Sequence, residues 1–318
     1  MKEVFSGVLA VLLLATSPDL IQHYATELGI AFAAESNEHL QPLITTSELV
    51  VGENRFAFGL VKANKLVENA DVQLRIYSIE GPEPLLVAET NALYHPIGDA
   101  TPGERVHRHA DGTRHVHAVS SDVRGLYITR LAFPRSGAWG IELQARDDDG
   151  SLKTARLTVT VAETPQSPAL GSPAPRSRNL VASDVRDLRL IDTSQKPDPR
   201  LHQTRIADAI AQGKPQLIVF ATPQFCTSRM CGPVVDIVRR LLPEYNKRVA
   251  FTHQEIWQDY ASKKIFPTVE EWRLVTEPWT FVLDGKGIIQ DKFEGLVTVR
   301  ELEHALQQVL QLNPPRRD

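Results

Sequence analysis

The chain is poor in cysteine and has no strongly basic segment. Its 318 residues contain two cysteines, and the formal net charge is −4. Two cysteines cannot make a disulfide scaffold, so a single close pair is redox-active, metal-binding or one local disulfide. The basic residues form no run longer than an adjacent pair, such as Arg316-Arg317 at the end of the chain. This charge distribution gives no case for nucleic-acid binding.

Several common catalytic motifs are also missing. The sequence has no P-loop, no dinucleotide-binding glycine fingerprint, no serine-hydrolase elbow and no His-Glu-x-x-His. Gly285 and Gly287 fit a turn rather than a phosphate cradle. The composition is 42% hydrophobic and 23% charged, which is ordinary for a soluble globular protein. The length allows two domains of ordinary size.

The longest apolar run lies at the N-terminus and is short. Val4–Ala15 follows Lys2 and is ended by Pro18. It is too short to span a bilayer and is typical of the hydrophobic part of a secretory signal. We therefore expect residues 1–34 to be a signal or an N-terminal membrane anchor of an exported, periplasmic or cell-surface protein. A buried core helix is the alternative.

Residues 41–163 predict a β-sandwich. Ala70–Tyr77 alternates cleanly, which places Val72, Leu74 and Ile76 on one face. Short strands separated by turns continue along this region, as in sandwich folds. Gly137-Ala138-Trp139-Gly140 resembles bacterial immunoglobulin-like domains of exported proteins, in which a Trp packs between the sheets. A generic sandwich with a core Trp is equally compatible.

A histidine-rich hairpin is expected within this sandwich. His107 and His109 lie before an Asp-Gly turn, and His115 and His117 lie after it. Alternate strand residues share a face, so pairing across the turn brings four imidazoles together as a candidate Zn or Cu site. His95 is a further candidate ligand. The alternative is an exposed polar hairpin whose histidines only titrate.

Residues 164–183 are rich in Pro and Ser without an apolar period, which predicts a linker. Residues 184–312 then predict an α/β domain. Leu217–Phe220 is a short buried strand, and Arg248–Thr252 is expected to lie parallel to it. Helices are expected over Leu201–Gln212, from Gly232-Pro233 onward, and over part of Glu255–Arg273.

Cys226 and Cys231 lie at or just before the N-terminus of the helix that opens at Gly232-Pro233, where partial positive charge favours thiolate. Five residues of regular helix rise about 7.5 Å, more than the usual Cα separation in a disulfide. Either Cys226 lies in the loop ahead of the helix, or the first turn unwinds when the bond forms.

This stretch resembles the active site of the thioredoxin superfamily: a strand, an aromatic residue, a cysteine, Cys-Gly-Pro and a helix. Thr276–Asp284 is similar to the cis-proline strand of that superfamily, and the resemblance covers roughly residues 184–312. The spacing is Cys-x4-Cys instead of Cys-x-x-Cys. It is shared with a subclass of peroxiredoxins, whose Pro-x3-Thr-x2-Cys pattern is not met.

The resemblance implies an extracytoplasmic thiol–disulfide oxidoreductase with a thiol or disulfide protein as partner and no required cofactor. Cys226 is the expected nucleophile and Cys231 the resolving thiol, with Glu277 and cis-Pro278 facing them. The expected fold is thus an all-β, immunoglobulin-like sandwich followed by an α/β, thioredoxin-like domain.

Two other interpretations stay open. His253 follows the strand Arg248–Thr252, at the sheet edge where the cysteines are expected, and could complete a Cu or Zn site with them. This resembles in outline the copper-delivery proteins of the same superfamily, which use Cys-x3-Cys; Met230 is an additional soft candidate ligand. The other interpretation is a structural protein whose cysteines are inert or form a static disulfide.

Overall fold

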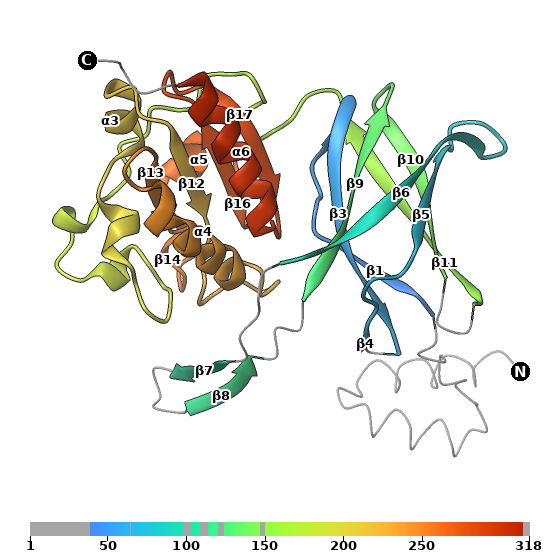
Figure 1. Ribbon diagram of the computed structural model, residues 1–318, viewed down its shortest axis with the longest axis horizontal. Helices are drawn as coiled ribbons and strands as arrows, with labels where there is room; N and C mark the ends of the chain where they lie inside the picture. Colours follow the sequence, from blue (N-terminus) through green and yellow to red (C-terminus); the bar gives the residue numbers. More distant parts are fainter. Residues whose placement is uncertain are drawn as a thin grey trace, which may run out of the picture. The chain divides into compact units, whose positions relative to one another are not determined.

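Alternating apolar residues after residue 40 form an all-β sandwich. The computed structural model describes residues 39–63, 65–97, 124–146 and 150–313, together with the backbone alone of 103–108 and 114–119. Residues 1–34, the expected signal or anchor, lie outside the described part. Nine strands make one sheet in the order β1-β3-β9-β6-β5-β10-β11-β2, with β4 beside β3 (Figure 1). Their bounds are β1 Gln41–Ile44, β2 Leu49–Val50, β3 Gly52–Lys62, β4 Lys65–Leu66, β5 Val72–Ser78, β6 Leu85–Pro96, β9 Gly125–Phe133, β10 Gly137–Arg146 and β11 Leu152–Ala162.

The sheet closes over its own core because β6 belongs to both halves. The first part of β6 pairs with β5, from Leu85 opposite Ser78 to Ala92 opposite Val72. Its last four residues, from Leu93 onward, pair with β9. The inward side chains of both halves form one apolar cluster. The all-β sandwich predicted for this region is confirmed.

Trp139 is the central large side chain of the sandwich. It is 1% exposed, and its indole Nε1 donates to the carbonyl oxygen of Arg135 at 3.2 Å. The guanidinium of Arg135 lies 4.8 Å from the centre of the indole ring, and the ring of Phe133 packs beside it. The tryptophan therefore has its polar atom satisfied while its rings fill the core.

The backbone of the histidine-rich segment forms a two-stranded hairpin, β7 (Gly103–Arg108) and β8 (Arg114–Val119). His107 pairs with His115, and His117 pairs with Arg105. His109 and the side chains of the other three histidines lie outside the described part of the chain. The metal site expected there remains a prediction.

Residues 216–312 contain a second, four-stranded sheet of order β13-β12-β16-β17 (Figure 1). β12 (Gln216–Phe220) lies parallel to β13 (Ala250–Gln254) and antiparallel to β16 (Trp279–Leu283), which pairs with β17 (Ile289–Glu294). β12, β13 and β16 are buried throughout, although only β12 contains a continuous apolar run of four residues, Leu217–Phe220.

Helices lie on both faces of this sheet. α4 (Cys231–Tyr245) and α6 (Val299–Leu312) share a core with alternate residues of β12 and with Val282. The other residues of β12 pack with α3 (Ile206–Ala211) and α5 (Pro267–Glu271). Short 3₁₀ turns precede α3: η1 Ala182–Asp184, η2 Leu188–Leu190 and η3 Pro199–His202.

Glu255–Arg273 is helical in part, as predicted, but the helix is short and Pro267 begins it. The chain forms two short strands, β14 (Trp257–Asp259) and β15 (Lys264–Ile265), and only α5 is helical. Aromatic packing accompanies the non-helical part of this segment. Tyr260 stacks on Phe225, which lies in the loop after β12, with ring centres 4.3 Å apart. Pro267 begins α5 instead of interrupting a helix, because a first-turn proline loses no hydrogen bond.

The Pro- and Ser-rich segment 164–183 packs along the chain that follows it. The amide of Gly171 donates to the carbonyl of Ile289, and the amide of Ala174 donates to that of Gly287. Ser177 is buried and hydrogen-bonded to Glu271. The segment has no apolar periodicity and no core of its own. Hydrogen bonds to these neighbours hold it in place. The domain boundaries at 163 and 184 remain predictions.

Residues Leu40–Asp318 form one compact unit. Glu294 accepts hydrogen bonds from the amides of Ser47 and Glu48, and Arg55 forms an ion pair with Glu301 at 2.6 Å. Lys292 bonds Glu48 at 2.8 Å. These charged groups are largely shielded from water, so their bonds are stronger than those of surface pairs.

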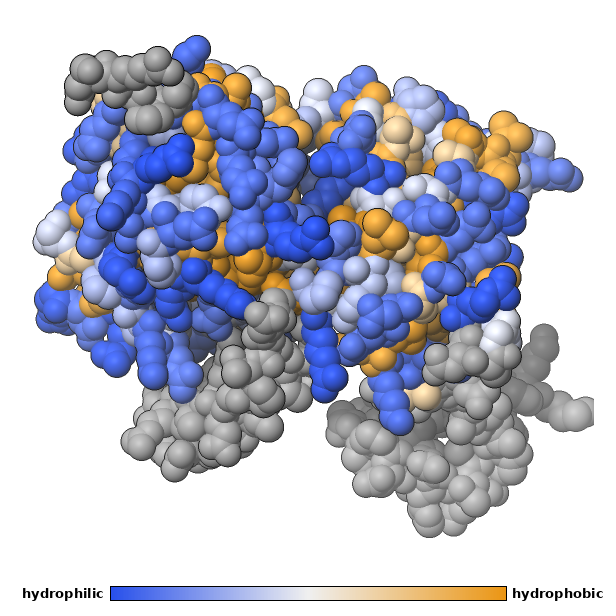
Figure 2. Space-filling model, viewed as in Figure 1, coloured by the Kyte–Doolittle hydropathy of each residue, from blue (hydrophilic) through white to orange (hydrophobic). Residues whose placement is uncertain are grey.

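The surface in Figure 2 is mostly hydrophilic, with apolar groups scattered over it. Among the described residues, the exposed large apolar side chains include Leu85, Val87 and Leu93 on β6. Leu86, between Leu85 and Val87, is exposed as well. Much of the surface of any folded protein is apolar. No described helix is both long and apolar enough to cross a membrane.

Candidate functional site

Two clusters of reactive or metal-ligating side chains occur in the described part of the chain. One contains Cys226, Cys231 and Glu277, and the other contains Asp192, His202 and His253. In each cluster, one donor atom of every residue lies within 4.8 Å of those of the others. Both clusters contact the loop that leaves β12 at Ala221: His253 bonds the carbonyl of Ala221, and Cys226 belongs to the loop itself.

The two cysteines are placed differently at the start of α4. Cys226 lies in the loop between β12 and α4 and is half-buried, whereas Cys231 is the first residue of α4 and is fully buried. Both thiols are free. The loop is closed by the amide of Cys226, which donates to the carbonyl of Thr222 at 3.0 Å. Of the two arrangements considered for Cys-x4-Cys, the structure has the first, with Cys226 ahead of the helix.

The pKa values of the two thiols shift in opposite directions. Hydrogen bonds from the Cys231 thiol, from Ser228 and from the backbone amides of Met230 and Cys231 lower the pKa of Cys226 to about 6. The Ser228 hydroxyl lies 3.1 Å from the sulfur. Burial, followed by the nearby Cys226 and Glu277, raises the pKa of Cys231 far above its usual range. The helix terminus thus favours thiolate at Cys226, while desolvation prevails at Cys231.

Glu277 completes the first cluster from the opposite segment of chain. Its peptide bond to Pro278 is cis, and β16 begins at the next residue. Burial and the charge of Cys226 raise the pKa of Glu277 to about 8. Its Oε2 atom is buried without a hydrogen-bond partner in the described structure. Three acidic groups therefore converge here: Cys226 raises the pKa of Glu277, and both of them raise the pKa of Cys231.

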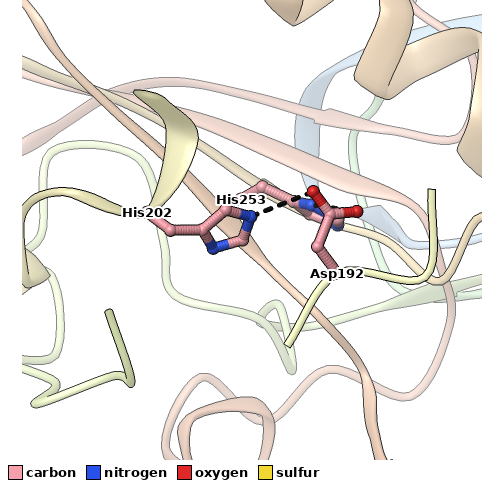
Figure 3. Close-up of side chains that lie close together, drawn as sticks. All are labelled: Asp192, His202 and His253. Atoms are coloured by element: carbon pink, nitrogen blue, oxygen red, sulfur yellow. Dashed lines mark hydrogen bonds and ion pairs between the residues drawn. The ribbon is translucent and has the colours of Figure 1, made fainter. Parts of the chain in front are cut away.

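The second cluster joins three separate segments of the chain (Figure 3). Asp192 follows η2, His202 ends η3, and His253 lies in β13. Asp192 Oδ2 lies 3.1 Å from His202 Nε2, and Asp192 Oδ1 lies 3.5 Å from His253 Nδ1. On its other side, His253 Nε2 donates to the carbonyl oxygen of Ala221 at 3.0 Å.

Burial and hydrogen bonding fix the charges of this cluster. Asp192 is buried, but the two neighbouring histidines hold the pKa of its carboxyl group far below the usual range. Burial lowers the pKa of His202. At His253 the bond and charge of Asp192 outweigh burial and raise the pKa. Asp192 is thus a carboxylate at neutral pH, and His202 is a neutral imidazole.

The structure brings together some of the residues singled out from the sequence and separates others. Glu277 lies with both cysteines, as expected. His253 lies with Asp192 and His202 instead of the cysteines, and it contacts Ala221 and Asp192. Asp192 and His202 were missed because they are far from His253 in sequence and belong to a segment without a recognised motif. The pairing of an acidic residue with histidines was the only sequence signal, and it is too common to be specific.

Comparisons with known proteins give limited information. No family model matches the chain, and no curated protein matches it. Among solved structures, CopC from Methylosinus trichosporium OB3b is 13% identical, with a TM-score of 0.20, over 39% of this chain and 95% of CopC. The PmoD soluble domain from Methylocystis sp. ATCC 49242 (Rockwell) is 11% identical, with a TM-score of 0.19, over 39% of this chain and 90% of that domain. Spo0M, a sporulation control protein from Bacillus subtilis, is 10% identical, with a TM-score of 0.21, over 40% of this chain and 49% of Spo0M. Scores this low carry no argument about function.

The recognition of an immunoglobulin-like domain followed by a thioredoxin-superfamily domain at residues 184–312 is wrong. No model of either family matches the chain, and strands predominate over helices in the described fold. The physical reason lies in the motifs. Cys-Gly-Pro and Glu277-Pro278 specify a local helix start and a local backbone bend, which unrelated folds also use, and the cysteine spacing departs from that of the superfamily.

Proposed function

We propose that the chain binds a thiophilic metal ion, Cu(I) or Zn(II), through Cys226, Cys231 and Glu277. The observation that carries this proposal is the convergence of two sulfurs and a carboxylate oxygen within 4.8 Å of one another. Thiolates are the ligands that select Cu(I) and Zn(II) in proteins. The third member of the set is a carboxylate, which zinc accepts readily and which balances the charge of either ion.

Electrostatics supports a cation at this position. The charge of Glu277 raises the pKa of Cys231, and the charge of Cys226 raises the pKa of Glu277. A bound cation removes this mutual repulsion, because each acidic group then faces a positive charge. Binding displaces the protons of Cys231 and Glu277, so affinity rises with pH.

Access to the cluster is open on one side. Cys226 and Glu277 are half-buried, while Cys231 is completely enclosed. An ion can therefore reach the pair from the loop side and be held against the buried sulfur. We infer from the apolar segment Val4–Ala15 that the protein acts outside the cytoplasm, where it would bind or carry the ion.

A competition experiment tests the proposal. Reduced, metal-free protein is titrated anaerobically with Cu(I) against a chromophoric Cu(I) chelator, because Cu(II) would oxidise the thiols. We expect one ion per chain, a loss of affinity of at least about 100-fold in Cys226→Ser and Cys231→Ser, and about 10-fold in Glu277→Gln. Thr227→Ala, an exposed substitution beside Cys226, is the matched control and should bind as the wild type does.

Failure of the wild type to compete for Cu(I) and for Zn(II) would refute the proposal. Unchanged affinity in Cys226→Ser, with the variant folded by circular dichroism, would also refute it. The same titration with His107, His109, His115 and His117 replaced by Ala tests the separate proposal that the hairpin β7–β8 holds an ion.

A second candidate function is thiol–disulfide exchange, which the opposite pKa shifts of the two cysteines favour. The Cys226 thiolate would attack a disulfide of a partner protein, forming a mixed disulfide and releasing one partner thiolate. Cys231 would then lose its proton to the Glu277 carboxylate and attack Cys226. This releases the second partner thiol and leaves Cys226 and Cys231 oxidised to a disulfide. A dithiol reductant would have to return the pair to the reduced state.

The two candidate functions are separated by turnover. Exchange predicts dithiothreitol-dependent reduction of a disulfide-linked peptide pair, none in Cys226→Ser, and a trapped mixed disulfide in Cys231→Ser detectable by mass spectrometry. Stoichiometric metal binding without such turnover would leave metal binding as the function of the pair.

A further inference from the structure

Asp192, His202 and His253 form a cluster that takes no part in the chemistry proposed for the cysteines. The three residues are 0%, 1% and 1% exposed, so none of them faces solvent. They come from three separate elements, which their side chains tie together (Figure 3). Two imidazoles and one carboxylate are a common ligand set for divalent transition metals.

The donor atoms are spaced as an ion requires. Each carboxylate oxygen of Asp192 faces one imidazole nitrogen, at 3.1 Å for His202 Nε2 and 3.5 Å for His253 Nδ1. Donors at about 2.0–2.1 Å from a tetrahedrally bound ion lie about 3.3–3.4 Å from one another. One carboxylate oxygen and two imidazole nitrogens, which lie within 4.8 Å of one another, can therefore serve as ligands, which gives three donor atoms from this chain.

The hydrogen bond between His253 and Ala221 supports the same metal site. A carbonyl oxygen can only accept, so the bond to Ala221 places a hydrogen on Nε2. When the ring is neutral, Nδ1 presents a lone pair to Asp192 Oδ1 at 3.5 Å, and this atom has no hydrogen-bond partner in the described structure. Two acceptors facing each other need a proton or a cation between them. Histidines that ligate metals commonly donate their other N–H to a backbone carbonyl in this way.

A second buried carboxylate belongs to the residue two positions after His253. Asp192 is 0% exposed and Glu255 is 1% exposed. Glu255 is held by the amide and hydroxyl of Thr193 and by the amide of Ile256. Two carboxylates in an enclosed volume require compensating positive charge. A divalent ion supplies it.

We propose that Asp192, His202 and His253 form a binding site for a divalent transition-metal ion of the Zn(II) class, separate from the cysteine cluster. The site is structural, because its complete burial leaves no route for a substrate. The ion fixes the segment of η2 and η3 against β13. This segment includes Thr193, whose hydroxyl accepts the amide hydrogen of Gln224 in the cysteine loop.

The experiment measures metal by ligand type. Wild type and the Cys226→Ser/Cys231→Ser variant are loaded with Zn(II), freed of excess ion and analysed for zinc content and for X-ray absorption at the zinc edge. We expect the double variant to keep one zinc per chain with a shell of nitrogen and oxygen only. Co(II) should bind the same variant and give a visible spectrum without sulfur charge-transfer bands.

Ligand substitutions give the second readout. In the double-variant background, Asp192→Asn and His202→Asn should lose zinc affinity by at least about 100-fold. The matched control His304→Asn, at an exposed histidine of α6, should keep it. If the substitutions unfold the protein, the parent Cys226→Ser/Cys231→Ser variant itself tests the proposal, through its X-ray absorption spectrum and the ¹⁵N resonances of its imidazoles.

The proposal is overturned if the parent binds no zinc in its nitrogen and oxygen shell, or if folded Asp192→Asn binds as tightly as the parent. It is also overturned if His253 carries protons on both ring nitrogens in the presence of saturating zinc, since a proton then occupies the position of the ion. None of these outcomes bears on Cu(I) binding by the cysteines, which the double variant lacks.

Discussion

His253 Nε2 lies 3.0 Å from the carbonyl oxygen of Ala221, the residue at which the chain leaves β12 for the loop that carries Cys226. A histidine that is fully buried therefore holds the start of the cysteine loop. The loop is closed one residue later, where Thr222 accepts the amide hydrogen of Cys226. The two clusters thus share one short piece of backbone.

This contact predicts the effect of replacing His253. In metal-free protein, His253→Phe should lower the free energy of unfolding by about 1–3 kcal/mol, because the Ala221 carbonyl and Asp192 lose a buried partner. Alkylation of Cys231 should also become faster as the loop loosens. Urea unfolding and mass spectrometry check the two effects, with His304→Phe on the surface of α6 as the control. Unchanged stability would mean that the carbonyl finds another donor.

The reactivity of Cys226 should follow its lowered pKa. In reduced, metal-free protein, the rate of alkylation by iodoacetamide should rise with a midpoint near pH 6, because the thiolate is the reacting form. Cys231→Ala removes the first of the stabilising hydrogen bonds and should move the midpoint upward. Rates measured from pH 4.5 to 9 test this. A midpoint at the ordinary value for cysteine in both proteins would contradict it.

Glu277 should make stability depend on pH. Its pKa of about 8 in the folded protein lies above the unfolded value, so the folded state holds the proton more tightly. Stability is then fully present below about pH 4.5 and is lost as the pH rises through 8. After allowance for partial exposure, the loss is on the order of 1 kcal/mol. Glu277→Gln should flatten this fall in urea unfolding at pH 6 and pH 9; an equal slope in both proteins would be the contrary result.

The core of the sandwich should be sensitive at Trp139. Trp139→Ala leaves a large cavity and should cost about 3–5 kcal/mol of unfolding free energy, whereas Trp139→Phe should cost less. Denaturant unfolding followed by circular dichroism measures both. Replacement of the exposed Leu85 by Ala on β6 is the control and should change stability little.

The first turn of α6 offers a smaller, local prediction. Thr298 Oγ1 accepts the amide hydrogen of Glu301 at 3.2 Å, and Glu301 accepts the amide hydrogen of Thr298 at 3.0 Å. Thr298→Ala should cost about 1 kcal/mol by removing this capping box, while Thr298→Ser should restore most of it. Thermal unfolding of the three proteins decides. Equal melting temperatures would show that the cap contributes nothing.

The sequence predicts the sandwich well because each strand carries its own signal. Val72, Leu74 and Ile76 alternate with polar residues, and all three are buried in β5. Sidedness of this kind is local, so no knowledge of distant residues is needed. The signal of β12 is also local, because Leu217–Phe220 is a continuous run of apolar residues.

Other parts depend on contacts between distant residues. The turn of β14 and β15 is set by Tyr260 stacking on Phe225, and this contact overrides the helical tendency of the segment. Asp192 and His253 lie 61 positions apart, and no local pattern joins them. The wrong recognition of residues 184–312 has a related cause, since short motifs specify a bend or a helix start without specifying the whole chain.

Strand β6 has a consequence for how the sandwich comes apart. Because its two ends pair with different neighbours, peeling one half away exposes the hydrogen-bonding edge of the other. We expect the amides of β5 and β9 to lose their protection against hydrogen exchange together, at one common opening free energy. The seam that closes the fold thereby makes it melt as a single cooperative piece.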